Sequence, residues 1–342
     1  MTTSGPAASA LIDLYDAALF DLDGVVYLGP IAVAGAAEGI AGLRDRGAKV
    51  GFVTNNAARS PAVVADHLVE LGIPASAADV VTSAQAAAHL VATRFGLGAR
   101  VLVVGGEGVA AAIAEAGLVG VASAEDSPVA VVQGYGFDLT WQQLNEAAIA
   151  INRGAHWVAT NTDPTRPTER GLVPGNGAAV AAVRMAVTVE PEVAGKPYRP
   201  LLDDTVARLG AERPIFVGDR LDTDVAGAVA AGLDSLFVLS GSHGASDLLA
   251  ADRWSRPTHL GWDLRALLEP VQVVTTSIDS FRCGGAAAMV VAGRLVVEGA
   301  APTYVNALWA TAQLAWQIAD AGSTVDLGPA LAALSRLAPE VA

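Results

Sequence analysis

The chain has 342 residues, more than one ordinary hydrophobic core organises, so the sequence predicts more than one domain. Hydrophobic residues make up 52% of it and charged residues 16%, a composition that excludes an intrinsically disordered protein. The formal net charge of −14 would repel a nucleic-acid backbone, so no nucleic-acid partner is expected. Residues 1–10 lack a basic stretch followed by an apolar one, and no uncharged apolar run reaches membrane-spanning length. We therefore expect a soluble, cytoplasmic protein with no membrane partner.

Three short apolar runs that end abruptly in polar residues indicate buried parallel strands. The runs span residues 17–20, 50–53 and 214–217. Helical stretches such as residues 61–71 lie between or after them, a pattern typical of a doubly wound α/β sheet. In such sheets ligands bind beyond the carboxyl ends of the strands, where Asp21, Thr54 and Asp219 would project. Residues far apart in the sequence are therefore expected to meet in one site.

The chain between the second and third of these runs is longer than one or two βα units require, which indicates an inserted α/β domain. Within it we expect strands at 100–104, 129–133 and 157–160 and helices at 107–116 and 141–153. A further segment follows the last run, with expected strands at 286–291 and 295–297 and a helix at 304–321. This last segment indicates a small appended domain.

The predicted fold class is α/β, a doubly wound, Rossmann-like parallel-sheet core with an inserted α/β domain and a small C-terminal α/β appendage. We expect residues 1–95 and 191–270 to form the two parts of the core. Residues 96–190 would form the insertion and residues 271–342 the appendage, whose role the sequence leaves open.

The strongest local signal is the Asp-Leu-Asp-Gly stretch that begins at Asp21. Asp21 and Asp23 lie one residue apart at the end of a buried strand, and they repel each other unless a cation or a proton intervenes. Gly24 permits a tight turn whose backbone N–H groups can bind an anion. Carboxylates, a divalent metal and phosphate thus form a self-consistent site, with an ordinary Asp-Gly turn as the structural alternative.

Two further elements add candidate phosphate donors. The hydroxyl of Thr54 and the amide of Asn55 follow a strand and could donate to a phosphoryl oxygen, although such residues also open helices. Lys196, one of only two lysines, stands between Gly195 and Pro197 and could neutralise phosphate and aspartate charge, with a surface lysine as the alternative.

Three more acidic residues follow the buried run at 214–217. Mg²⁺ prefers one or two carboxylates together with water and phosphate oxygens, so Asp219 is the natural ligand. Asp224 and Asp222 are candidates to support this ligand without contacting the metal themselves. Acidic residues also favour a solvated helix N-terminus, and for Asp222 this alternative stays open.

In order and spacing the four elements resemble the motifs of the haloacid dehalogenase superfamily: Asp-x-Asp-Gly-Val, Thr, Lys, and Gly-Asp-x-x-x-Thr-Asp. They are similar to the branch that holds phosphoglycolate, glycerol 3-phosphate, pyridoxal phosphate and nucleotide phosphatases. The resemblance covers about residues 15–265 and rests on residues 23–27, 54–56, 195–198 and 218–224. In that branch a large α/β cap is inserted between the second and third motifs, where the insertion is predicted.

The resemblance implies a Mg²⁺-dependent phosphoric monoester hydrolase that works through an aspartyl-phosphate. It implies that Asp21 attacks phosphorus, and that Asp23 protonates the leaving alkoxide and then activates the hydrolytic water. Thr54 and Lys196 would hold the phosphoryl oxygens. Asp21, the backbone carbonyl of Asp23, and Asp219 would bind Mg²⁺.

A cap excludes water and bulky molecules, so we expect a small phosphate monoester as substrate. In the similar enzymes the cap segments matching residues 159–163 and 174–177 face the active site. Asn161, Asp163 and Arg166 are therefore candidates to contact the leaving group, with a turn and a surface arginine as the alternative. The resemblance favours glycerol 3-phosphate, and 2-phosphoglycolate, pyridoxal phosphate and a nucleotide monophosphate are the alternatives.

Two interpretations from other protein classes compete with a phosphatase. Gly106, Gly108 and Ala111 follow an apolar run and fit a Gly-x-Gly-x-x-Ala dinucleotide fingerprint, with Glu125 near the spacing of a ribose-binding acid. A dinucleotide-dependent oxidoreductase would leave the four acidic and basic elements unexplained. A phospho-receiver protein would also use paired acids and a lysine, but the insertion and Asp23 argue against it.

The appended segment looks distantly similar to part of a GCN5-related acetyltransferase. It is too short for a whole domain of that type and lacks the glycine-rich loop that would bind the coenzyme pyrophosphate, so no acetyl transfer is expected. Formation of a homo-oligomer stays open. The lone Cys283 is expected to be a small buried apolar residue, and the histidines show no metal-ligand spacing.

Overall fold

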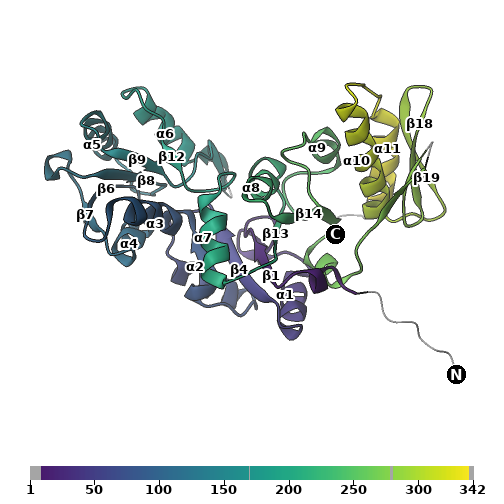
Figure 1. The fold of residues 1–342 in the computed structure, drawn as a ribbon, viewed down its shortest axis with the longest axis horizontal. Helices are drawn as coiled ribbons and strands as arrows, with labels where there is room; N and C mark the ends of the chain where they lie inside the picture. Colours follow the sequence, from purple (N-terminus) through teal and green to yellow (C-terminus); the bar gives the residue numbers. More distant parts are fainter. Residues whose placement is uncertain (1–8, 169, 278–279, 339–342) are drawn as a thin grey trace. The chain divides into compact units, whose positions relative to one another are not determined.

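The computed structural model describes residues 9–168, 170–277 and 280–338, so most of the segment 1–10 considered above lies outside the described residues. The chain forms two compact units. The first unit contains Met1–Leu28, Ala32–Lys49 and Arg213–Ala342, and the second contains Gly29–Ile31 and Val50–Glu212. Figure 1 shows the elements along the chain.

The first unit is built on parallel strands in the order β15-β14-β13-β1. Their bounds are β1 (Ala17–Phe20), β13 (Pro214–Gly218), β14 (Asp234–Val238) and β15 (His259–Gly261). Every residue of β1 and of β13 is buried, as expected for parallel strands covered on both faces. The helical elements of this part are η1 (Leu11–Leu14), α1 (Ala36–Asp45), η4 (Leu221–Val225), α8 (Ala226–Ala231), α9 (Ala245–Ala250) and η5 (Leu264–Leu268). The two-residue strands β2 (Tyr27–Leu28) and β3 (Ile31–Ala32) follow β1 along the chain.

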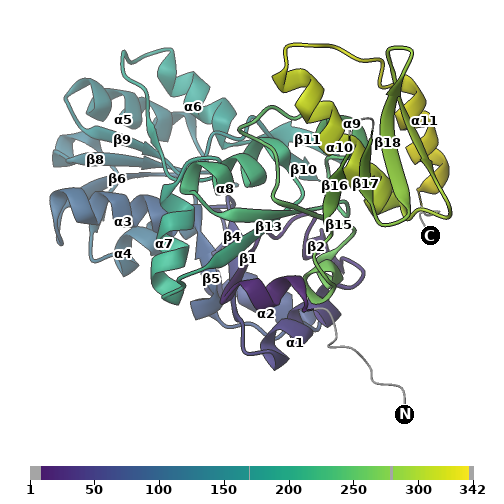
Figure 2. The same cartoon turned by 45° about the vertical axis from the view of Figure 1, so that its right-hand side comes forward.

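The C-terminal part of the first unit has a different, antiparallel architecture. Its four strands lie in sequence order, β16 (Val274–Thr276), β17 (Phe281–Cys283), β18 (Ala286–Val291) and β19 (Arg294–Gly299). Helices α10 (Tyr304–Asp320) and α11 (Gly328–Leu337) pack against this sheet, as both views show (Figures 1 and 2). Trp316 of α10 donates its indole N–H to the carbonyl of Leu248 on α9 at 2.9 Å, and the apolar side chains of both regions form one cluster. The appendage therefore shares a hydrophobic core with the strands that precede it.

The second unit contains a five-stranded parallel sheet in the order β12-β9-β8-β6-β7. The strands are β6 (Arg100–Val104), β7 (Val119–Val121), β8 (Ala130–Gln133), β9 (His156–Ala159) and β12 (Glu192–Val193). Figures 1 and 2 show α3 (Ser83–Phe95) and α4 (Glu107–Glu115) on one face, and α5 (Trp141–Asn152) and α6 (Asn176–Arg184) on the other. The rest of the unit consists of β4 (Lys49–Thr54), β5 (Val80–Thr82), β10 (Thr165–Thr168), β11 (Gly171–Pro174), α2 (Pro61–Glu70), η2 (Ala77–Asp79), η3 (Ala124–Asp126) and α7 (Pro200–Leu209). Strands β10 and β11 pair as an antiparallel hairpin, and β4 pairs with β5 in parallel.

The α/β fold class predicted from the sequence is confirmed, and so are the individual elements expected above. The bounds of β1, β6 and β18 coincide with the predicted runs, and α4, α5 and α10 end one residue before the predicted helices. Pattern reasoning did not predict α3, α11 or the hairpin β10–β11. Among the described residues no helix has the length and apolar character needed to cross a membrane.

Candidate active site

The loop after β1 brings Asp21 to the carboxyl end of the first unit's sheet. Asp21 continues the parallel ladder by donating its backbone N–H to the carbonyl of Val217 at 2.9 Å. Gly24 has a φ of +88°, and its N–H donates to the Tyr27 carbonyl at 2.8 Å, which closes a tight turn. A Cβ atom at Gly24 would lie 2.5 Å from Oδ2 of Asp219, so glycine is required here for both conformation and space. Asp21 is half-buried and Asp23 is exposed.

Asp219, which follows β13, is completely buried and is held by the loop after β14. The backbone N–H of Ser242 donates to Asp219 Oδ2 at 2.6 Å, and that of His243 donates to the Asp219 carbonyl at 3.3 Å. Gly241 packs so closely against the carboxylate that any added Cβ would overlap it. The Asp219 carboxylate is thus held by a backbone donor and by contact with glycine.

Asp224 lies on η4, a π-helical turn, and is also completely buried. Its Oδ2 accepts the backbone N–H of Arg220 at 3.1 Å, and a Cβ atom at Gly218 would overlap its side chain. Carboxylate oxygens of Asp21, Asp219 and Asp224 all lie within 4.8 Å of one another. We refer to these three residues as the acidic cluster. Three converging carboxylates form a hard oxygen donor set of the kind that Mg²⁺ prefers, so the residues present fit this metal.

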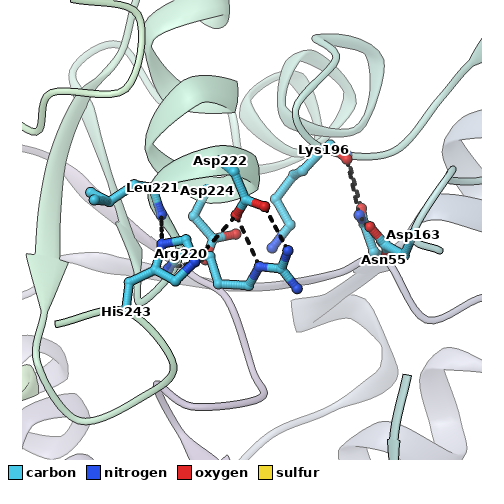
Figure 3. Close-up of polar contacts among 8 residues, drawn as sticks. All are labelled: Asn55, Asp163, Lys196, Arg220, Leu221, Asp222, Asp224 and His243. Carbon is cyan, nitrogen blue, oxygen red and sulfur yellow. Dashed lines mark hydrogen bonds and ion pairs between the residues drawn. The ribbon is translucent and has the colours of Figure 1, made fainter. Parts of the chain in front are cut away.

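Asp222, whose role the sequence left open, is not one of the three residues of this cluster. Its carboxylate forms a bidentate ion pair with Arg220, with Nε–Oδ1 and Nη2–Oδ2 distances of 3.0 and 2.7 Å (Figure 3). His243 lies near it and accepts the backbone N–H of Leu221 at Nδ1. Partial burial would raise the pKa of Asp222, but the hydrogen bonds and charge of Arg220, with a contribution from His243, hold it below its ordinary value. Asp222 therefore acts as the counter-ion of Arg220.

Thr54, Asn55 and Lys196 lie together in the second unit. Thr54 and Lys196 are almost completely buried. The Thr54 hydroxyl oxygen accepts the backbone N–H of Asn56 at 3.1 Å, which leaves its proton to donate elsewhere. The Asn55 side chain contacts the backbone of Lys196 and the carboxylate of Asp163 (Figure 3). The Asn55 carboxamide is thus engaged by hydrogen bonds within the protein.

The predicted cap residues differ in their surroundings. Asn161 is buried, donates to the Asn55 carbonyl at 2.7 Å and accepts the N–H of Asp163 at 3.1 Å. Asp163 is half-buried and joins the same contacts through its carboxylate. The Arg166 guanidinium lies 4.9 Å from the ring centre of Tyr135 and 5.3 Å from that of Phe137. Arg166, which lies on β10, is therefore packed against two aromatic rings and is not a freely solvated surface arginine.

The loop Ser240–His243 was missed by sequence reasoning. Besides Ser242, the Ser240 hydroxyl contributes by donating to the Gly24 carbonyl at 2.8 Å, which ties the loop after β14 to the loop after β1. The signal that could have found it is the Ser-Gly-Ser stretch directly after a buried apolar run. It carries no acidic residue and so resembles any strand-ending turn.

The glycines that suggested a dinucleotide fingerprint are explained by packing. Cβ atoms at Gly106 and Gly108 would meet the backbones of Gly136 and Ala57, respectively, and the Gly106 N–H donates to the Tyr135 carbonyl. Neighbouring backbone thus occupies the space that a pyrophosphate would need. Glu125, the candidate ribose ligand, instead pairs with Arg153 at 2.8 Å. The oxidoreductase alternative therefore has no site in this loop.

Comparisons with known proteins agree with this geometry. A family model described as haloacid dehalogenase-like hydrolase matches residues 18–119, and one described as HAD-hydrolase-like matches residues 193–267. Together the two matches contain all three residues of the acidic cluster and Lys196.

Individual relatives extend the likeness to most of the chain. A D-glycerol 3-phosphate phosphatase of Mycobacterium tuberculosis is 53% identical over 253 residues, which cover 74% of this chain and 71% of the relative. A 5'-nucleotidase of Bacillus subtilis is 36% identical over 247 residues, which cover 72% of this chain and 94% of the relative. The crystal structure of a glycerol phosphate phosphatase from Mycobacterium tuberculosis in complex with magnesium superimposes with a TM-score of 0.86 at 42% identity, over 97% of this chain and 99% of that one.

Proposed function

We propose that this chain, which belongs to the haloacid dehalogenase-like hydrolases, hydrolyses glycerol 3-phosphate to glycerol and phosphate with Mg²⁺ as its cofactor. The observation that carries the proposal is the acidic cluster at the carboxyl end of the first unit's sheet. Three converging carboxylates repel one another and are stabilised by a bound divalent cation, and a phosphate ester is a substrate that such a cation would bind. The choice of glycerol 3-phosphate is supported by the likeness to the D-glycerol 3-phosphate phosphatase.

In the proposed mechanism Asp21 is the nucleophile. One of its carboxylate oxygens attacks phosphorus, the P–O bond to the leaving alkoxide breaks, and Asp23 gives its proton to that alkoxide. Water then attacks phosphorus of the aspartyl-phosphate while Asp23 takes a proton from it, and phosphate leaves as the Asp21 carboxylate is regenerated. The exposed Asp23 side chain is consistent with proton exchange with solvent.

Asp21, Asp219 and the Asp23 carbonyl would hold the metal, with Asp224 supporting it from its buried position on η4. Bound Mg²⁺ supplies positive charge that offsets the carboxylates and the phosphoryl oxygens. The Thr54 hydroxyl and the Lys196 ammonium would bind those oxygens, and a buried ammonium acts strongly because little water screens it. The catalytic contribution of these residues is alignment and charge neutralisation, as a loose phosphoryl-transfer transition state requires.

The inserted domain, which we assign to residues 96–190, would act as a cap that limits the substrate to small phosphate monoesters. Residues 1–95 and 191–270 would form the catalytic core, and residues 271–342 the appended domain. The half-buried Asp163 and Arg166 are the cap residues proposed to contact the leaving group. We also propose that the protein works in the cytoplasm.

The test is phosphate release from a panel of monoesters with Mg²⁺ present or chelated. The panel contains the two enantiomers of glycerol 3-phosphate, 2-phosphoglycolate, pyridoxal phosphate and a nucleoside 5'-monophosphate. The last is included because the 5'-nucleotidase relative matches over 94% of its own length. We expect Mg²⁺-dependent release that is fastest with glycerol 3-phosphate. A different preferred ester would overturn only the substrate, whereas no release from any ester would overturn the phosphatase function.

A further inference from the structure

The carboxamide of Asn55 makes three hydrogen bonds inside the second unit. Its Nδ2 donates to the Lys196 carbonyl at 3.0 Å, and its Oδ1 accepts the Lys196 N–H at 2.8 Å. The same Nδ2 donates to Oδ2 of Asp163 at 3.2 Å. An amide has two N–H donors, and both are used here. We call this arrangement, which is visible in Figure 3, the amide clamp.

The clamp fixes the backbone of Lys196 from both sides of the residue. A carboxamide that receives an N–H and donates to a C=O of one residue pairs with it much as a neighbouring strand would. Gly195 makes this approach possible, since a Cβ atom there would lie 2.6 Å from Asn55 Oδ1. Lys196 is 2% exposed, so its ammonium reaches its position through a packed interior and depends on where its backbone is held.

Other contacts hold the clamp itself in place. The carbonyl of Asn55 accepts the Ser83 hydroxyl and the Nδ2 group of Asn161, both at 2.7 Å. The bond from Asn161 ties Asn55 to the segment after β9, and Asn176 in turn donates to the Asn161 carbonyl at 2.7 Å. Asn55 thus bonds to two chain segments that lie 108 and 141 residues away from it in sequence.

We propose that Asn55 is a positioning residue that acts through Lys196, and that its carboxamide is not itself a ligand of the phosphoryl group. This inference rests on the proposed function. Thr54 and Lys196 are brought to one site because Asn55 directly follows the first and clamps the second. Misplacing a catalytic group by about 1 Å can cost about 10²-fold in rate, so loss of the clamp has a kinetic effect without any lost substrate contact.

A double-mutant cycle tests the inference. Asn55→Ala is expected to lower kcat/KM for the best substrate by about 10²-fold. In a Lys196→Met background, which keeps the length of the side chain but removes its charge, adding Asn55→Ala is expected to cost less than about threefold, because the positioned group is already gone. A control is Asn152→Ala, which also removes an amide bonded to a backbone carbonyl of the second unit and is expected to leave kcat/KM unchanged.

If the two effects multiply fully in the double variant, Asn55 acts independently of Lys196 and the inference is wrong. A wild-type chain with no phosphatase activity would instead overturn the proposed function, so the two failures are distinguishable.

A second pair of variants decides the matter if Asn55→Ala does not fold. Asn55→Asp keeps the acceptor for the Lys196 N–H but loses both donors and faces the Asp163 carboxylate. Adding Asp163→Asn removes the repulsion between residues 55 and 163, but it does not restore the donor to the Lys196 carbonyl. The double variant is therefore expected to recover less than about threefold in kcat/KM over Asn55→Asp. Full recovery of activity on adding Asp163→Asn would show that the bonds to the Lys196 backbone do not set activity.

Discussion

The two units of the molecule hold their proposed catalytic residues by different means. In the first unit the Asp219 carboxylate is fixed by a backbone N–H of Ser242 and by contact with Gly24 and Gly241. In the second unit Lys196 is fixed by the side-chain amide of Asn55. Rigid backbone suits a cluster of like charges, because the groups must stay close despite their repulsion. A side-chain clamp is sufficient for a single cation, because only the position of its charged group has to be fixed.

This difference predicts how each unit fails. The acidic cluster should be sensitive to atoms added at its glycines, whereas the clamp should be sensitive to the loss of one amide. Damage to the first should appear as weaker Mg²⁺ binding, and damage to the second as weaker phosphate binding with Mg²⁺ binding intact.

The largest effect is expected for Asp21→Asn, which removes the proposed nucleophile with almost no change in volume. Turnover should fall by about 10³-fold or more, since no other group can form the covalent intermediate. The measurement is phosphate release at saturating Mg²⁺. As a control, Asp222→Asn alters an aspartate that pairs with Arg220 outside the acidic cluster, and it should lower turnover far less. Equal losses in the two variants would contradict the assignment.

Gly241→Ala should break the acidic cluster specifically. The new Cβ would overlap the Asp219 carboxylate and displace it from the Ser242 N–H, so the Mg²⁺ concentration for half-maximal activity should rise about tenfold or more. Gly244→Ala is a matched control in the same loop, because a Cβ there meets no atom within 4 Å. An unchanged Mg²⁺ requirement in Gly241→Ala would mean that Asp219 does not hold the metal.

Gly195→Ala should affect the second unit in the complementary way. The added Cβ would overlap the Thr160 carbonyl and crowd Asn55 Oδ1, which opens the amide clamp. We expect KM for the phosphate ester and the inhibition constant of inorganic phosphate to rise about fivefold to tenfold, by analogy with the cost of misplaced groups. The Mg²⁺ concentration for half-maximal activity should stay that of the wild type. If Gly195→Ala changed only the Mg²⁺ requirement, the assignment of phosphate binding to this part of the second unit would be wrong.

A smaller effect is expected on stability at the opposite, amino end of the first unit's sheet. There His259 Nε2 lies 2.9 Å from the Tyr15 hydroxyl, which donates to Asp234 at 2.8 Å. Burial lowers the pKa of His259 below its ordinary value of 6.5, against the opposing charge of Asp234. The unfolded chain therefore takes up the proton first, so the stabilisation is present above about pH 6.5 and is lost as pH falls through the folded-state pKa.

Urea unfolding between pH 7 and pH 5 measures this effect. The free energy of unfolding should decline less steeply in His259→Gln than in the wild type, while the Mg²⁺ requirement at pH 7 stays unchanged. Parallel pH profiles of stability would show that His259 does not contribute.

Much of the architecture could be predicted because it depends on local patterns. Asp21, Thr54 and Asp219 were placed at strand ends from the buried apolar runs before them, and the structure has strands at those runs. The proximity of Asp224 to Asp21 could not be predicted, because it depends on a π-helical turn that no sequence period reveals.

The remaining features depend on contacts between distant segments. The sequence predicts the amide of Asn55 as a phosphate donor and cannot predict its bond to Lys196, since nothing local indicates a partner 141 residues away. The same limit applies to Ser242, whose only relevant property is where its backbone N–H points. The sequence does not distinguish Arg166 from a surface arginine, because the contacts of this residue of the β10–β11 hairpin with Tyr135 and Phe137 are tertiary.

The central claim is that a phosphoryl group passes through Asp21, and the stereochemistry at phosphorus tests it most directly. A phosphorothioate analogue of the best substrate, made chiral with oxygen isotopes, would be hydrolysed in isotopically labelled water. Two successive in-line displacements predict net retention of configuration in the thiophosphate product. Net inversion would mean that water attacks the ester in a single step, and would contradict the covalent role of Asp21.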